Sequence, residues 1–75
     1  MSIADSVRIE LAFEGGQIIS ALVAPETADA VERSLLAGSQ GTLQMDTDDG
    51  RVTVNVPQVV YLKRYAREAA VGFGI

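Results

Sequence analysis

The sequence predicts an α+β fold: a small ββαββ(β) domain in which an antiparallel sheet carries one helix packed on one face. Two stretches of alternating apolar and polar residues, each interrupted by a turn that contains glycine, predict two β-hairpins. Between them lies one stretch with apolar residues at helical spacing, opened by a proline and closed by a glycine. We expect residues 1–75 to form a single domain, because no linker, repeat or low-complexity segment divides them.

The first hairpin is predicted over residues 7–23. Apolar residues recur at every second position from Val7 to Phe13, which is the period of a half-buried strand. A run rich in Ile and Val, from Gln17 to Val23, resumes this pattern. Gly15 and Gly16 lie between the two runs, where a tight reversal needs residues that accept positive φ angles.

The stretch Glu14-Gly15-Gly16-Gln17 also contains the Gly-Gly-Gln tripeptide that peptide-chain release factors carry at their catalytic tip. In those factors the tripeptide belongs to a much larger protein that also reads the stop codon. A chain of 75 residues has no room for that second module. We therefore interpret the two glycines as turn residues and expect no hydrolytic activity from them.

The segment Pro25–Ala37 predicts the helix. Proline suits the first helical position, and the acidic residues Glu26 and Asp29 suit the positive end of the helix dipole. Gly38 follows as a left-handed C-cap. The stripe predicted to face the sheet consists of Ala28, Val31 and Leu35, with Leu36 at its edge.

A second hairpin is predicted around the pair Asp49-Gly50. Alternating apolar residues precede this pair from Leu43 to Met45 and follow it from Val52 to Val56. Pro57 then ends the fourth strand, because proline cannot donate a ladder hydrogen bond.

Residues 58–70 admit two readings, as a fifth strand or as the start of a helix. Branched and aromatic residues at the start favour the strand, whereas the later alanines favour the helix. We favour a strand through Arg64, followed by a turn or short helical segment. The strand would place Val59, Tyr61, Lys63 and Tyr65 on one side, and the helix would place Val59, Leu62, Ala66 and Ala69 on one stripe.

The composition predicts self-association. The chain has no Cys and no His, which excludes disulfides and the usual structural zinc ligands, and a chain of this length buries only about 60% of its unfolded surface. Since 48% of its residues are hydrophobic, we expect a second copy to cover apolar surface, giving a homo-oligomer and most simply a dimer. Residues 1–6 are expected to be a flexible N-terminus, and residues 66–75 to dock on or exchange with a partner subunit. The predicted oligomer interface consists of Val59, Tyr61, Leu62, Val71 and Phe73.

The predicted function is that of a non-enzymatic interaction or assembly domain. No nucleophile has a histidine base, and no glycine-rich turn matches a phosphate-binding or dinucleotide-binding fingerprint. The acidic stretch from Asp46 to Gly50 fails the spacing of an EF-hand, because glycine arrives fifth and the twelfth residue is Pro57. We predict no catalytic residues, no cofactor and no metal site.

The N-terminal sequence has no basic start followed by an apolar run of signal-peptide length. The longest apolar runs anywhere are only a few residues, so no transmembrane segment is predicted. We expect a cytoplasmic protein.

An alternative function is the binding of single-stranded nucleic acid. Residues 1–50 contain two basic and nine acidic residues, whereas residues 51–75 contain four basic and one acidic residue. Aromatic and basic side chains interleaved on a strand can stack on bases and neutralise phosphates. We favour a simpler reading, in which the basic segment meets the acidic helix residues Glu26, Asp29 and Glu32 of the same or a neighbouring subunit. The alternative nucleic-acid contacts are Tyr61, Lys63, Arg64, Tyr65 and Arg67.

Three short motifs stand out in the C-terminal third: Gly50-Arg51, Val60-Tyr61 and Val71-Gly72-Phe73-Gly74. Through these motifs the chain resembles a family of small actinobacterial proteins of unknown function. The sequence departs from the family at Leu62-Lys63-Arg64, where an acidic residue is typical, and at the Glu14–Gln17 turn. The resemblance implies the ββαββ plan and carries no activity or functional residue.

Overall fold

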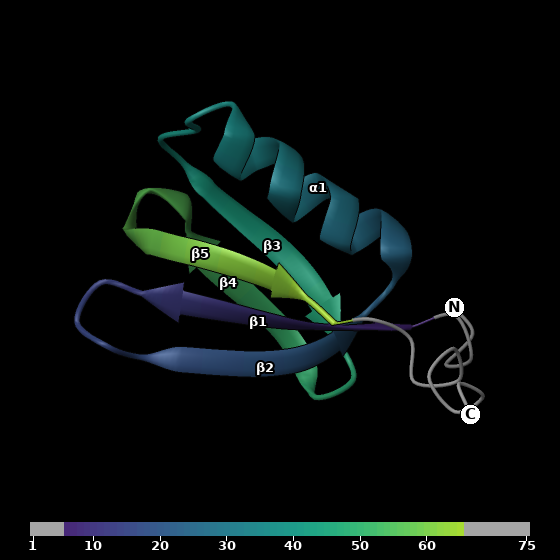
Figure 1. Cartoon of the computed structure of the whole chain (residues 1–75). Helices are drawn as coiled ribbons and strands as arrows, with labels where there is room; N and C mark the ends of the chain where they lie inside the picture. The colour runs from purple at the N-terminus through teal and green to yellow at the C-terminus, as the bar shows by residue number, and fades with distance from the viewer. Residues whose placement is uncertain (1–5, 66–75) are drawn as a thin grey trace, which may run out of the picture.

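The computed structural model describes residues 6–65 (Figure 1). The segment 66–75, predicted to dock on or exchange with a partner subunit, and residues 1–5 of the expected flexible N-terminus lie outside the described residues. The elements follow in the order β1 (Val7–Phe13), β2 (Ile18–Val23), α1 (Pro25–Leu36), β3 (Thr42–Thr47), β4 (Gly50–Asn55), a 3₁₀ turn (Val56–Gln58) and β5 (Val59–Arg64).

The five strands form one antiparallel sheet in the order β4-β3-β2-β1-β5. The one α-helix within residues 6–65, α1, contacts β1, β3 and β5. This arrangement confirms the predicted α+β class, an antiparallel sheet with one helix packed on one face.

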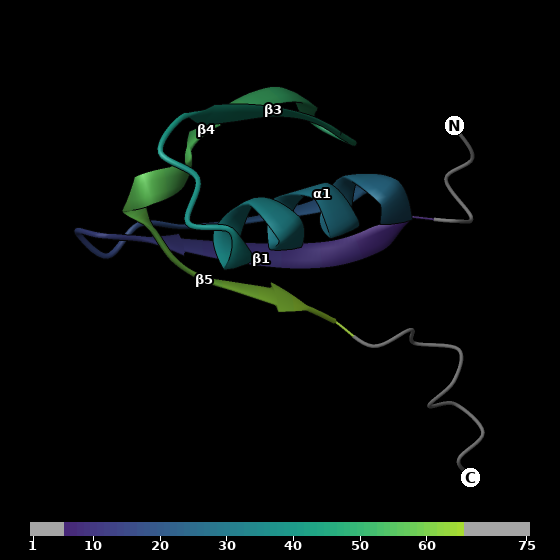
Figure 2. The ribbon, with the colours of Figure 1, turned by 90° about the horizontal axis from the view of Figure 1, so that it is seen from above.

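The sheet bends between β2 and β3. β1 pairs with β2 from Val7 to Ala12, but β2 and β3 pair only at Val23 and Thr47. In Figure 2, α1 lies between the β3–β4 hairpin and β5, so the two parts of the sheet stand on either side of the helix. One helix therefore closes a core that the bent sheet surrounds.

The core is small and entirely apolar among the described residues. Leu11 and Val23 are fully buried, and no polar or charged residue is buried. The prediction that Ala28 and Val31 face the sheet is confirmed, and Leu35 packs at the edge of the core. The central cluster consists of Ile9, Leu11, Val23, Ala28, Val31, Met45 and Val54.

The predicted hairpin turn at Gly15 and Gly16 is confirmed. Their φ angles are +100° and +95°, a region that side chains with a Cβ rarely adopt. The amide of Phe13 donates to the carbonyl of Gln17 at 2.8 Å, which closes the turn. The glycines of the Gly-Gly-Gln tripeptide thus have a structural purpose in the reversal.

The helix ends close to its predicted end, at a left-handed glycine. α1 stops at Leu36, one residue before the predicted end, and Ala37 is its C-cap. Gly38 has a φ of +67° and donates its amide to Leu35, while the amide of Ser39 donates to Ser34. This pair of bonds is the Schellman motif, which satisfies carbonyls at the end of a helix.

Residues 59–64 form a strand, which confirms the favoured reading of that segment. β5 pairs antiparallel with β1, and Ala12 faces Tyr61 while Phe13 faces Val59. Val60 is therefore the extra residue of a β-bulge. Because the bulge moves Val59 to the core side, the prediction that Val59 shares a side with Tyr61 was wrong.

Replacing Leu11 with alanine tests whether this small core limits stability. Leu11 is fully buried in β1, so we expect its truncation to lower the free energy of unfolding by about 2–5 kcal/mol. The control is Ile18→Ala, at a side chain that is 57% exposed, for which we expect less than about 1 kcal/mol. Urea unfolding of both variants provides the measurement, and equal losses would contradict the assignment of the core.

Candidate interaction surface

β5 lies at one edge of the sheet, with β1 on its only paired side among residues 6–65. The amide of Tyr65 donates to the carbonyl of Arg8 at 3.0 Å. Because hydrogen-bonded and non-hydrogen-bonded pairs alternate in an antiparallel ladder, the backbone groups of Leu62 and Arg64 point away from β1. This free edge is a template on which another strand can pair.

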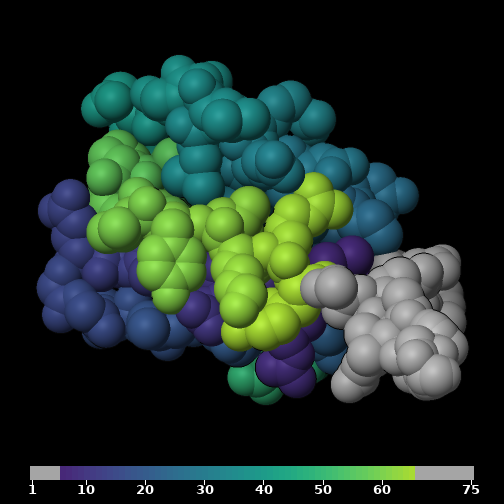
Figure 3. Space-filling model, in the orientation of Figure 1, coloured from purple at the N-terminus to yellow at the C-terminus, as the bar shows by residue number. Residues whose placement is uncertain are grey.

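Exposed apolar side chains gather along this edge. Val60 is 62% exposed and Tyr61 is 42% exposed, while Leu36 at the end of α1 is 82% exposed. Figure 3 shows β5 at the surface between α1 and the β1–β2 hairpin. Exposed apolar surface beside an unpaired strand edge is a feature of interaction sites.

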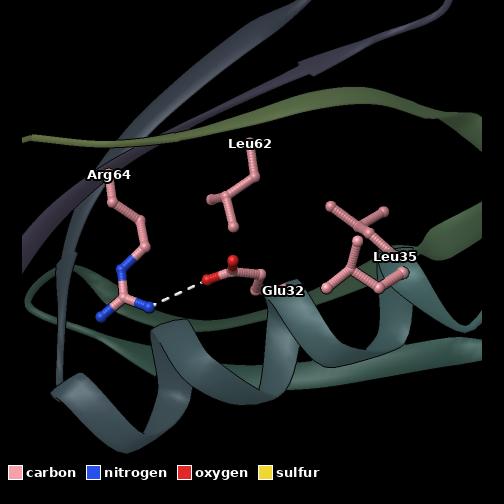
Figure 4. A pocket seen from close by; sticks show the side chains of 5 residues that line it. Glu32, Leu35, Leu62 and Arg64 are labelled. Carbon is pink, nitrogen blue, oxygen red and sulfur yellow. Dashed lines mark hydrogen bonds and ion pairs between the residues drawn. The ribbon is translucent and has the colours of Figure 1, made fainter.

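A groove of about 400 Å³ runs between α1 and β5 (Figure 4). Leu35 of the helix faces Leu62 of the strand across it, Leu36 also lines it, and Glu32 and Arg64 lie at one end. Apolar side chains thus line the part of the groove beside the free edge of β5.

An ion pair joins β5 to the helix at the end of the groove. Arg64 Nη1 lies 2.8 Å from Asp29 Oδ1 and 3.0 Å from Glu32 Oε1. Hydrogen bonds to Asp29 and then to Glu32 raise the pKa of the Arg64 guanidinium. The predicted contact between the basic segment and the acidic helix is therefore present within one chain for these three residues.

The opposite face of β5 carries a separate group of side chains, which we call the tyrosine cluster: Arg8, Glu10, Tyr61, Lys63 and Tyr65. The hydroxyl of Tyr61 donates to Glu10 Oε2, and the hydroxyl of Tyr65 donates to Glu10 Oε1 at 2.9 Å. Lys63 Nζ lies 4.4 Å from the centre of the Tyr65 ring, and the Arg8 guanidinium carbon lies 5.9 Å from it. One carboxylate thus holds two aromatic rings, and two cations lie over one of the rings.

The hydrogen bonds of the tyrosine cluster shift the pKa values of the three groups that they join. The bond from Tyr61 and then the bond from Tyr65 lower the pKa of the Glu10 carboxyl from its usual value of 4.5. The same bonds to Glu10 raise the pKa values of both phenols above 10.0. The cluster therefore consists of a charged carboxylate and two neutral phenols at neutral pH.

The structure divides the residues predicted to contact a partner between the two faces of β5. Tyr61, Lys63 and Tyr65 lie on the open face, as the strand reading predicted. Leu62 and Arg64 line the groove on the helix face, and Val59 packs at the core. The remaining predicted contacts, Arg67, Val71 and Phe73, lie outside the described residues.

Arg8 and Glu10 were missed as members of a site. Their only signal in the sequence is that they occupy the polar positions of the first strand. Placing them beside Tyr61 and Tyr65 requires the pairing of β1 with β5, between residues that are 51 and 55 positions apart for the bonds to Glu10.

The acidic turn between β3 and β4 has structural contacts. Asp46 pairs with Arg51 at 3.0 Å, and Asp48 accepts a hydrogen bond from the amide of Leu22 at 3.1 Å. The amide of Asp49 donates to Thr47 Oγ1 at 3.0 Å. Within residues 6–65, no three acidic side chains converge in a way that could hold a metal ion.

No protein-family model matches the chain, and neither a curated protein nor a solved structure matches it. The resemblance of the C-terminal third to small actinobacterial proteins stays a hypothesis. No helix in the described part of the chain is both long and apolar enough to cross a membrane.

The lowered pKa of Glu10 predicts a pH dependence of stability. Because its carboxylate is favoured in the folded state, Glu10 contributes stability above pH 4.5, and this contribution is lost as pH falls through the lowered pKa. We expect the wild type to lose stability relative to Glu10→Gln over that range. Urea unfolding at a series of pH values measures the difference.

A control for this dependence removes the donors and keeps the carboxylate. In a chain with Tyr61→Phe and Tyr65→Phe, replacing Glu10 with Gln should change the loss of stability at acid pH much less, because the two hydrogen bonds that lower the Glu10 pKa most are gone and only the weaker effect of Lys63 remains. Parallel curves for the wild type and Glu10→Gln would show that the carboxylate is not stabilised by the tyrosines.

Proposed function

We propose that this chain is a non-enzymatic assembly domain that self-associates through the free edge of β5. The observation that carries the proposal is the coincidence of three features on one strand. The backbone groups of Leu62 and Arg64 point outward, exposed Val60 and Tyr61 flank them, and the apolar groove runs alongside. An added strand would pair with the free backbone groups of β5 and would at the same time cover the apolar surface beside them.

The other edge of the sheet offers less apolar surface. The exposed side chains of β4 are Arg51, Thr53 and Asn55, and its valines face the core or its margin. A polar edge strand gains little from excluding water. The difference between the edges favours β5 as the interface.

An antiparallel pair of β5 strands is compatible with two-fold symmetry. With Leu62 facing the same residue of the second copy, Tyr61 of each copy would neighbour the partner's Lys63, a favourable aromatic and cationic pair. Arg64 already pairs with Asp29 and Glu32, so the approach of two copies does not oppose two unpaired guanidinium groups. The same surface is thus complementary to itself.

The modest size of the core gives such pairing a physical reason. Only nine apolar residues among positions 6–65 are buried. Burying one Val or Leu side chain stabilises by about 1.5–3 kcal/mol, so covering Val60 and Leu36 would add substantially to the stability of so small a domain.

The mass of the protein in solution tests this proposal. Sedimentation of the full chain should give the mass of two chains, and Val60→Lys should raise the dimer Kd by about 10-fold to 100-fold, because burial is replaced by charge. Val60 is 62% exposed, so its substitution leaves the core intact. Ile18→Lys is the matched control, since Ile18 is 57% exposed and lies on β2, and it should leave the mass unchanged.

Two results would contradict the proposal. A wild type that sediments as a single chain at high concentration has no such interface. A mass above two chains would point to β5 of one copy pairing with β4 of the next, which is a head-to-tail contact rather than a two-fold one.

A further inference from the structure

The open face of the sheet carries two of the three cations that form no ion pair within residues 6–65, and the third, Arg33, lies on α1. Among the described residues, Arg51 pairs with Asp46 and Arg64 pairs with Asp29 and Glu32. Arg8 and Lys63 form no ion pair among these residues, and both lie over the ring of Tyr65. Together with the Glu10 carboxylate, whose pKa the charge of Lys63 also lowers, the two cations leave the open face with a small net positive charge in an acidic protein.

The aromatic rings on this surface are held in place. Glu10 accepts the hydroxyls of Tyr61 and Tyr65 with separate oxygens, so both rings are anchored at the sheet. The two cations lie over the ring of Tyr65, whereas Tyr61 is 42% exposed and no cation of the described residues lies over its ring. Tyr61 can therefore offer a ring face to a ligand.

The neighbouring strand extends this surface without covering it. Ala12, Glu10 and Arg8 of β1 pair with residues of β2. α1 packs on the opposite face of the sheet, against the core. The partners of these three β1 residues on β2 are Ile18, Ser20 and Leu22, respectively. These residues extend the open face beyond β1 with a partly apolar surface.

We propose that the tyrosine cluster binds a short single-stranded nucleic acid, with one base stacked on Tyr61 and phosphates neutralised by Lys63 and Arg8. Stacking on an aromatic ring and neutralisation by nearby cations are the two interactions by which sheets bind single strands with little sequence preference. All these side chains come from one chain, so the binding does not depend on self-association through β5.

The geometry changes the set of contacts that the sequence predicted. Arg64 lies on the helix face and is paired with two carboxylates, so it does not take part. Arg8 replaces it, because β1 lies beside β5 and places Arg8 next to Tyr65. Two phosphate contacts for each chain make the binding weak and strongly dependent on salt.

Fluorescence anisotropy of a labelled oligouridine of about ten nucleotides tests the inference on the full chain. With two phosphate contacts, the logarithm of the binding constant should fall with the logarithm of salt concentration with a slope of about −1.4, and Lys63→Gln should reduce the slope to about −0.7. Arg51→Gln is the matched control, because Arg51 lies on β4 and pairs with Asp46, and it should leave the slope unchanged.

The ring is tested separately from the charges. Tyr61→Ala should weaken binding at least about fivefold, whereas Tyr61→Phe keeps the stacking face and should bind within about threefold of the wild type. Circular dichroism of each variant confirms that the fold is kept.

A polyglutamate peptide of similar length distinguishes a general anion surface from a nucleic-acid surface. It should bind more weakly than the oligouridine and should not respond to Tyr61→Ala, because it has no base to stack. No anisotropy change with the oligouridine at low salt would overturn the inference. Equal binding of both probes, with no effect of Tyr61→Ala on either, would overturn it as well.

Discussion

The bend between β2 and β3 is the constraint on which the rest of the structure depends. A single helix can cover only one side of a hydrophobic core, and this chain has no disulfide that could add to its stability. Because β2 and β3 meet only at Val23 and Thr47, the β3–β4 hairpin can turn toward α1 from the side opposite β5. The helix is thereby buried between two parts of one sheet, and the outer surface of β1 and β5 stays open. Both proposed interaction surfaces follow from this division.

Local patterns predicted most of the fold. Alternation in residues 7–13, glycines at the turns and the helical stripe each depend on neighbours in the sequence, and each was confirmed. The bulge at Val60 was not predictable, because nothing nearby in the sequence marks where β5 takes an extra residue against β1. The candidate site was predicted only in part for the same reason: Tyr61, Lys63 and Tyr65 follow strand periodicity, but Glu10 joins them only through long-range pairing.

β5 separates two kinds of chemistry by the alternation of its side chains. Leu62 and Arg64 face the helix, where an apolar contact and an ion pair fix the strand to α1. Tyr61 and Lys63 face outward, where Tyr61 donates a hydrogen bond to Glu10 and Lys63 lies over the ring of Tyr65. An edge strand built in this way presents its backbone toward a second copy and its outer face toward a ligand, and the side chains of Tyr61 and Lys63 belong to both proposed surfaces. Neighbouring residues of β5 thus belong to different surfaces, because their side chains lie on opposite faces of the sheet.

The pairing of β1 with β5 has a consequence for biosynthesis. Tyr61 lies 51 residues after Glu10, and at about 5–20 residues per second the ribosome needs about 3 to 10 s to add that length of chain. During that interval β1 and β2 can form their hairpin, but the second side of β1 stays without its native neighbour. The nascent chain therefore passes through a stage with an uncovered apolar strand, in which capture by a chaperone or a wrong partner competes with the arrival of β5.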